Sequence, residues 1–195
     1  MASLDTLDVE SPPRRHRITV DEYLRMGEVG LFAPDARVEL IDGEVFDMAP
    51  IGDSHNGKVD RLSRIFHRAV GDRAIVRTQG SSRLGNLSMP QPDLALLAPR
   101  EDFYEHGGSA TADILLVAEV SDSTLRFDRD IKMPLYARHG VPEAWIVDVQ
   151  HGELRIYRSP RDGSYCDETV TSAPGEIRPV KLPDIALDLR ALFGT

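Results

Sequence analysis

The chain has 195 residues, of which 41% are hydrophobic and 28% are charged, and its net charge is −9. This composition is ordinary for a globular protein, and the single cysteine, Cys166, excludes an internal disulfide. The acidic balance argues against strong non-specific binding of nucleic acid, because such binding depends on lysine and arginine side chains that neutralise phosphates.

Three features predict a cytoplasmic protein with no membrane segment. The lone cysteine suits a reducing compartment, no apolar run reaches the length of a membrane span, and the N-terminus MASLDTLDVESPP lacks the pattern of a signal peptide. We expect residues 1–17, which end in a basic cluster, to form a flexible arm, and residues 18–195 to form one domain. Cys166 lies in the polar stretch SYCDE, which favours a half-buried strand residue over a nucleophile.

The first predicted elements are a short helix and a hairpin. Thr19-Val-Asp-Glu22 has the pattern of a capping box, which predicts a helix that runs to Met26. Asp42-Gly43 then separates two apolar-rich runs, and this dipeptide favours a type I′ turn, because both of its residues adopt positive φ readily. We expect the paired strands at about 38–41 and 44–48.

The middle of the chain predicts a helix followed by central strands. Apolar residues recur at steps of three and four between residues 53 and 70, which indicates an amphipathic helix, with Asp53 or Ser54 as its cap. A short strand is expected at 74–79. Two nearly all-apolar runs follow at 92–98 and 113–120, and such runs are typical of strands buried on both faces.

The segment from Asp128 to His139 predicts a further helix that Pro134 complicates. Proline is comfortable only in the first turn of a helix, so we expect regular helix from about Met133, with Lys132 at or just before its first turn.

The remaining chain predicts strands and a short terminal helix. Strands are expected at 143–149, 153–158 and near 164–171, and a helix is expected around 188–192. The order of these elements predicts a mixed α/β protein whose sheet cannot be purely parallel.

Charged residues at the edges of the apolar strands are the candidates for chemistry. Asp93 opens one strand and Glu119 lies near the end of the next, and a charge in either place is costly unless it is paired or ligates a cation. Two carboxylates can hold Mg²⁺ or Mn²⁺, and the backbone carbonyl of Val120 could add a ligand. Lys132, on the following helix, could stabilise charge on a phosphate or orient a water. The alternative to a metal site is that Asp93 and Glu119 are solvated residues at strand edges and that Lys132 is an ordinary surface side chain.

Several motifs resemble the Uma-two family of bacterial endonucleases, a branch of the PD-(D/E)xK superfamily. The resemblance covers about residues 18–193, and the block after Ala118 is its most specific part. The motifs are TVDEYLRM from residue 19, RVELIDGEVFDMAP from 37, SHN from 54, PDLALL from 92, AEVSDSTLRFDRDIKMPLYARHGVPEAWIVDV from 118 and ELRIYR from 153.

This resemblance implies a restriction-endonuclease-like core, in which helices flank a central mixed sheet. Asp93 matches the aspartate of the family's PD motif and Glu119 matches its second acidic residue. Position 121, where the superfamily signature has lysine, is Ser121, and Lys132 matches a lysine that this family carries on the following helix. Glu39 matches a glutamate near the site that could ligate a second metal ion, although an acid in a hairpin strand needs no ligand to explain it.

The resemblance also suggests residues of the cleft. His55 matches a recurrent histidine of the family, and Gln79 ends a short strand where relatives in the superfamily sometimes carry a glutamine. A capping or solvated role is the alternative for His55. We expect Asp128 to cap its helix and Tyr136 to pack in the core.

The resemblance therefore predicts a metal-dependent endonuclease that hydrolyses DNA, with Asp93, Glu119, Lys132 and Glu39 as catalytic residues. By analogy with the fold, we expect a homodimer. The alternative is a nuclease-fold protein that binds nucleic acid or regulates another process without efficient cleavage, which the acidic charge and the displaced lysine favour.

Overall fold

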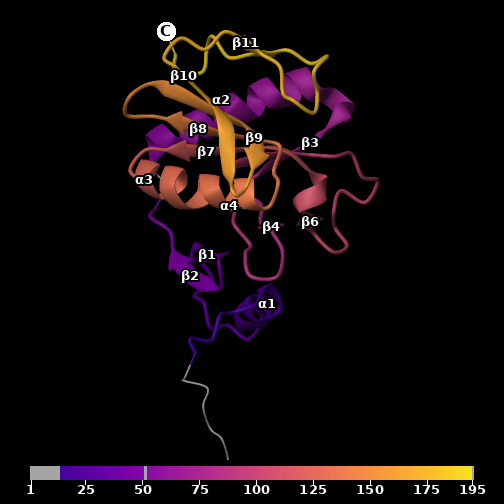
Figure 1. The fold of residues 1–195 in the computed structure, drawn as a ribbon, viewed down its shortest axis with the longest axis vertical. Coiled ribbons are helices and arrows are strands. Elements are labelled where there is room, and N and C mark those ends of the chain that lie inside the picture. Colours follow the sequence, from indigo (N-terminus) through magenta and orange to yellow (C-terminus); the bar gives the residue numbers. More distant parts are fainter. Residues whose placement is uncertain (1–13, 51, 195) are drawn as a thin grey trace, which may run out of the picture.

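A six-stranded mixed sheet forms the centre of the computed structural model, which describes residues 14–50 and 52–194 (Figure 1). The strand order is β10-β9-β8-β7-β5-β3; β7 and β8 run parallel and the other neighbours are antiparallel. The strands are β3 (Ile75–Thr78), β5 (Leu94–Leu97), β7 (Ile114–Ser121), β8 (Glu143–Asp148), β9 (Glu153–Arg161) and β10 (Ser164–Thr171). The predicted mixed α/β class is confirmed.

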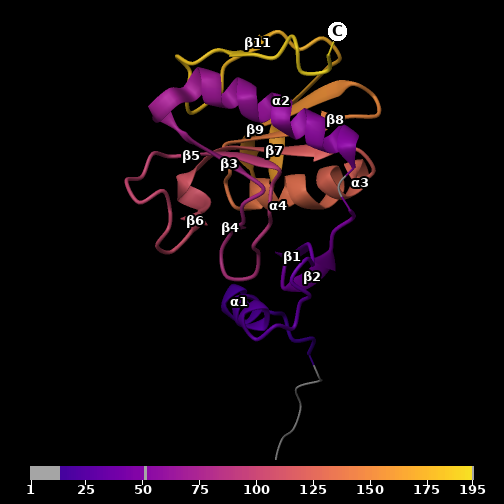
Figure 2. The ribbon, with the colours of Figure 1, turned by 180° about the vertical axis from the view of Figure 1, so that it is seen from behind.

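The sheet is covered on both faces, which explains its apolar central strands. Every residue of β5 and of β8 is buried, because alternate side chains enter two separate cores. On one face, α2 (Asp53–Val70) packs against the sheet through its residues Leu62 and Phe66. The centroid of the Phe66 ring lies 5.7 Å from the centroid of the Trp145 ring. The second face is covered by the helix that follows β7, and Figures 1 and 2 show the two helical layers on opposite sides of the sheet.

That second helix is continuous from α3 (Leu125–Phe127) through a π-helical turn, η3 (Asp128–Lys132), into α4 (Met133–Arg138). In the π turn the N–H of Met133 donates to the carbonyl of Asp128, five residues back. The wider turn accommodates Pro134, whose ring would clash with a carbonyl of the preceding turn in a regular helix. Regular α-helix begins at Met133 as predicted, but Lys132 lies inside the helical run.

The N-terminal part forms a small unit beside the sheet. Thr19 and Glu22 make the predicted capping box of α1 (Val20–Glu28). The hairpin of β1 (Val38–Ile41) and β2 (Glu44–Asp47) turns at Asp42-Gly43, where both φ angles are positive. The N–H of Met89 donates to the carbonyl of Leu40, so the hairpin contacts the loop before β5. Residues 1–13 of the predicted arm lie outside the described residues, and Arg17 donates to the carbonyl of Asp42.

The short elements connect these layers. They are η1 (Gly71–Arg73), β4 (Ser82–Arg83), β6 (Ser109–Ala110), η2 (Thr111–Asp113), β11 (Glu176–Ile177) and β12 (Leu187–Asp188). None of the described helices combines the length and the apolar character of a membrane span.

Three sequence-based expectations are wrong. Residues 188–192 do not form the predicted helix: β12 ends at Asp188 and a turn follows, in which the N–H of Leu192 donates to the carbonyl of Leu189. Leu189 and Leu192 are buried and hold this turn against the core that contains α2. The N-cap of α2 is Gly52, with no side-chain cap, in place of Asp53 or Ser54. Cys166 is exposed on β10, which pairs only with β9 at the edge of the sheet.

Candidate active site

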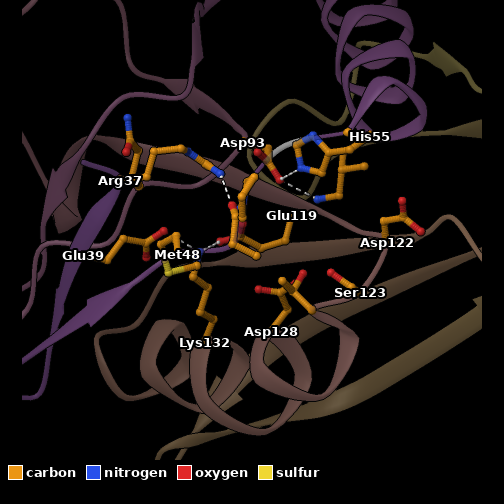
Figure 3. A pocket seen from close by; sticks show the side chains of 16 residues that line it. Arg37, Glu39, Met48, His55, Asp93, Glu119, Asp122, Ser123, Asp128 and Lys132 are labelled. Carbon is orange, nitrogen blue, oxygen red and sulfur yellow. Dashed lines mark hydrogen bonds and ion pairs between the residues drawn. The ribbon is translucent and has the colours of Figure 1, made fainter. Parts of the chain in front are cut away.

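An acidic pocket lies at the edge of the sheet where β7 ends and β5 begins (Figure 3). The pairing of Leu94 with Ala118 places Asp93 and Glu119 at this same edge, although 26 positions separate them in the chain. The β1–β2 hairpin brings Glu39, the first turn of α2 brings His55, and the π turn brings Lys132. Side chains from five separate segments therefore line one pocket.

The pocket holds more negative than positive charge. Four of its carboxylates are buried, with exposed fractions of 2% to 7%; they belong to Glu39, Asp93, Glu119 and Asp128. The buried cation among them is Lys132, at 2% exposure. Burial raises the pKa of Glu39, of Asp128 and, most strongly, of Glu119, and the charge of Lys132 opposes this rise in each case.

Lys132 bridges two of the carboxylates. Its Nζ lies 3.0 Å from Glu39 Oε1 and 3.2 Å from Glu119 Oε1. Burial by itself would lower the pKa of Lys132, but the charges of Glu119, Glu39 and Asp128 outweigh it and raise that pKa above its usual value. The side chain is therefore an ammonium at neutral pH, and it ties the hairpin to the sheet.

Asp93 is held through one of its two oxygens. The backbone N–H of Val120 donates to Asp93 Oδ2 at 2.9 Å, and His55 Nε2 lies 3.0 Å from the same oxygen. Within the described part of the chain no hydrogen bond reaches Asp93 Oδ1. His55 lines the pocket, and it contacts the carboxylate of Asp93.

Two residues contribute more than the sequence suggested. Asp128 was expected to cap a helix, but it lies inside the helical run, where Ser121 Oγ and Thr124 Oγ1 donate to its Oδ2 at 2.7 and 2.6 Å. Tyr136 was assigned to the core, and its buried hydroxyl donates to Glu119 Oε1 at 2.5 Å. Both residues lie four positions from Lys132, a spacing that brings side chains together on one face of a helix and could have identified them.

Gln79, the glutamine that the sequence suggested for the cleft, does not line this pocket. It adopts a positive φ of 50°, its N–H donates to the carbonyl of Asp93, and its carbonyl accepts from the side chain of Gln91. Gln91 is the glutamine that lines the pocket. Gln79 therefore supports the site through its backbone.

The acidic residues do not form a closed set of metal ligands. Within residues 14–50 and 52–194, no three side chains of histidine, cysteine, aspartate or glutamate come together closely enough to hold a metal ion. The ammonium of Lys132 lies against both Glu39 and Glu119. Glu39 Oε2, however, is buried and has no hydrogen-bond partner among the described residues, which leaves a carboxylate oxygen at the pocket that needs one.

Comparison with known proteins identifies a family and two similar proteins. The model of the Uma2 family, described as "Putative restriction endonuclease", matches residues 20–190. An uncharacterized protein of Synechocystis, sll1609, is 29% identical over 123 residues, which cover 61% of this chain and 67% of the relative. A crystal structure titled as a "putative nuclease belonging to DUF820" from Anabaena variabilis aligns with a TM-score of 0.69 over 90% of this chain and 97% of that one, at 18% identity. This last similarity establishes a shared fold.

Proposed function

Because the chain belongs to the Uma2 family, we propose that it is a nuclease that hydrolyses phosphodiester bonds of DNA with the help of Mg²⁺ or Mn²⁺. The observation that carries the proposal is a single pocket in which the carboxylates of Glu39, Asp93 and Glu119 lie with the buried ammonium of Lys132. Hydrolysis of a phosphodiester needs an activated water and positive charge beside the phosphate, and these residues can support both.

The donor set of the pocket fits a hard divalent cation. Its candidate ligands are oxygens, and Glu39 Oε2 is a buried oxygen with no partner in the described part of the chain. Asp93, Glu119 and the backbone carbonyl of Val120 would hold the cation, and Glu39 would add a further ligand. When bound, Mg²⁺ or Mn²⁺ lowers the pKa of a coordinated water and polarises the phosphate.

Lys132 contributes charge to the proposed reaction. The neighbouring carboxylates raise its pKa, so it stays protonated at neutral pH and cannot act as a general base. Its ammonium instead stabilises negative charge on the phosphate oxygens as water attacks phosphorus and the bond to the leaving oxygen breaks. Glu39 and Glu119 hold the ammonium in place through contacts of 3.0 and 3.2 Å.

The test is cleavage of double-stranded DNA, single-stranded DNA, branched DNA and RNA with Mg²⁺, with Mn²⁺ and with a chelator. We expect the purified chain to cleave DNA with either cation, and Asp93→Asn to lose this activity while it keeps the fold. Asp60→Asn, on the exposed side of α2, is the matched control and should cleave normally. Full cleavage by Asp93→Asn would contradict the assignment, and cleavage restricted to RNA would correct the substrate.

The net charge and the contacts of Lys132 favour a second function, which is binding without efficient cleavage. The net charge is −9, and Lys132 occupies two of the carboxylates that a cation would need. A protein of this kind could bind nucleic acid or a regulatory partner without efficient cleavage. Titration with Mn²⁺ by calorimetry separates the two functions, since the absence of binding in the millimolar range would favour the second.

The proposed nuclease would act as a homodimer. A two-fold pair presents two copies of the pocket, and two copies can cut both strands of a duplex. Light scattering at several protein concentrations would detect the dimer, and a monomer at all of them would contradict it.

A further inference from the structure

The hydroxyl of Tyr136 makes a short contact inside the proposed active site. It donates to Glu119 Oε1 at 2.5 Å, and both residues are buried, with exposed fractions of 0% and 2%. From this contact we infer that Tyr136 is a positioning residue, which orients the carboxylate of Glu119 toward a divalent cation. The inference rests on the metal-dependent function proposed above.

Glu119 needs such a residue because its carboxylate can rotate. The last torsion of a glutamate side chain has a broad, two-fold preference, so the chain itself does not fix which oxygen faces the pocket. Oε1 contacts two donors, the Tyr136 hydroxyl and the ammonium of Lys132 at 3.2 Å. No described residue donates a hydrogen bond to Oε2. The two donors therefore hold one oxygen and leave the other for a ligand of the pocket.

Asp93 is arranged in the same way, which supports this interpretation. Its Oδ2 faces two donors, the Val120 N–H and His55 Nε2, at 2.9 and 3.0 Å. Both carboxylates are thus fixed through one oxygen by two groups. In many metalloproteins, groups that hydrogen-bond to a metal ligand without contacting the metal hold that ligand in a fixed orientation. Their loss commonly weakens metal binding by about 10- to 100-fold.

A tyrosine suits this position because it donates without adding charge. Lys132 already supplies a positive charge to Oε1, and a second cation there would compete with a divalent ion. The ordinary pKa of a tyrosine is about 10, so the phenol keeps its proton at neutral pH. A hydroxyl that donates to a carboxylate forms a short, strong hydrogen bond.

The experiment compares Tyr136→Phe with Tyr165→Phe in the full chain. Tyr165 is the matched control, because its hydroxyl donates to the carbonyl of Val141 at 2.9 Å and its ring packs against the same core, outside the pocket. Calorimetric titration with Mn²⁺ gives the Kd of each protein. We expect Tyr136→Phe to weaken Mn²⁺ binding by about 10-fold, and Tyr165→Phe to bind Mn²⁺ as the wild type does.

Stability and coupling complete the test. Phenylalanine keeps the ring of Tyr136, and if the variant is too unstable for calorimetry, the shift of its urea midpoint with Mn²⁺ reports the same Kd. In the Glu119→Gln background the additional Tyr136→Phe change should leave Mn²⁺ affinity unaltered, because Tyr136 acts through Glu119. An unchanged Kd for Tyr136→Phe overturns the inference alone. A wild-type chain that binds no Mn²⁺ overturns the proposed metal dependence and the inference with it.

Discussion

The ammonium of Lys132 lies 3.0 Å from Oε1 of Glu39, a residue 93 positions away in the chain, and both side chains are almost fully buried. Glu39 belongs to the β1–β2 hairpin and Lys132 to the π turn, so this ion pair joins the N-terminal unit to the helix below the sheet. Removal of this ion pair should therefore lower the free energy of unfolding of the protein.

We expect Lys132→Met to lower the free energy of unfolding by about 3–5 kcal/mol in the absence of divalent cation, because it leaves Glu39 and Glu119 buried without their counter-charge. Urea denaturation measures the loss. In a Glu39→Gln background the same change should cost less, since one of the two charges has gone. A loss below about 1 kcal/mol, as is typical of exposed ion pairs, would contradict this account.

The stability of the metal-free protein should depend on pH through Glu119. Burial raises the folded-state pKa of this residue well above the ordinary value of 4.5, so the folded state binds more protons than the unfolded state at pH values above 4.5. The stabilisation from the protonated form is complete below that value and is lost as the pH rises toward the folded-state pKa. We therefore expect the melting temperature to fall as the pH rises above the ordinary value of 4.5. Glu119→Gln should flatten this slope, and an unchanged slope in that variant would assign the dependence to other groups.

His55 offers a separate test of how Asp93 is oriented. Its Nε2 lies 3.0 Å from Asp93 Oδ2, and we expect His55→Ala to weaken Mn²⁺ binding by about 10-fold, as loss of a group that hydrogen-bonds to a metal ligand commonly does. His67→Ala removes an exposed histidine from the same helix and serves as the control. Calorimetry distinguishes the variants, and equal affinities for the two would show that His55 has no role in orienting Asp93.

The hairpin turn supplies a prediction about backbone geometry. Gly43 has a φ of 80°, and a Cβ atom there would lie 2.6 Å from the Cβ of Arg17. We expect Gly43→Ala to destabilise the protein by at least about 1–2 kcal/mol, the usual cost of left-handed backbone for alanine. Gly57→Ala, on α2 with nothing within 4 Å, should instead stabilise it by up to about 1 kcal/mol. Thermal denaturation of both variants checks the pair, and a neutral Gly43→Ala would show that the turn adapts.

Much of the fold could be predicted from local patterns. The capping box at Thr19, the turn at Asp42-Gly43 and the apolar period of α2 each depend on neighbouring residues, and the structure has all three. The prediction of a terminal helix at 188–192 is wrong because so few apolar residues do not distinguish a helix from a turn, and the packing of Leu189 and Leu192 against the core decides between them. Strand pairing and the layer of helices on each face follow from long-range contacts that local patterns do not contain.

The candidate site was predictable in its residue types and less so in its contacts. Asp93, Glu119, Glu39 and Lys132, the residues that the resemblance selects, line one pocket. The contact of Tyr136 with Glu119 was missed because a tyrosine in an apolar helix is usually a core residue, although its spacing of four residues from Lys132 could have indicated it. Asp128 was misjudged because its helix begins three residues earlier than the sequence suggested, at Leu125.

The π turn at 128–132 makes the length of this segment as important as its composition. Each residue advances the side-chain direction by a fixed step, about 100° in a regular α-helix and less in a π turn. A chain shortened by one residue between Asp128 and Lys132 could therefore still form a helix but would aim these two groups differently. Point substitutions at the exposed Arg129 and Asp130 should consequently be tolerated far better than deletion of either one. When distant homologues are aligned, a gap inside this segment would therefore mark a protein whose lysine no longer reaches its carboxylates.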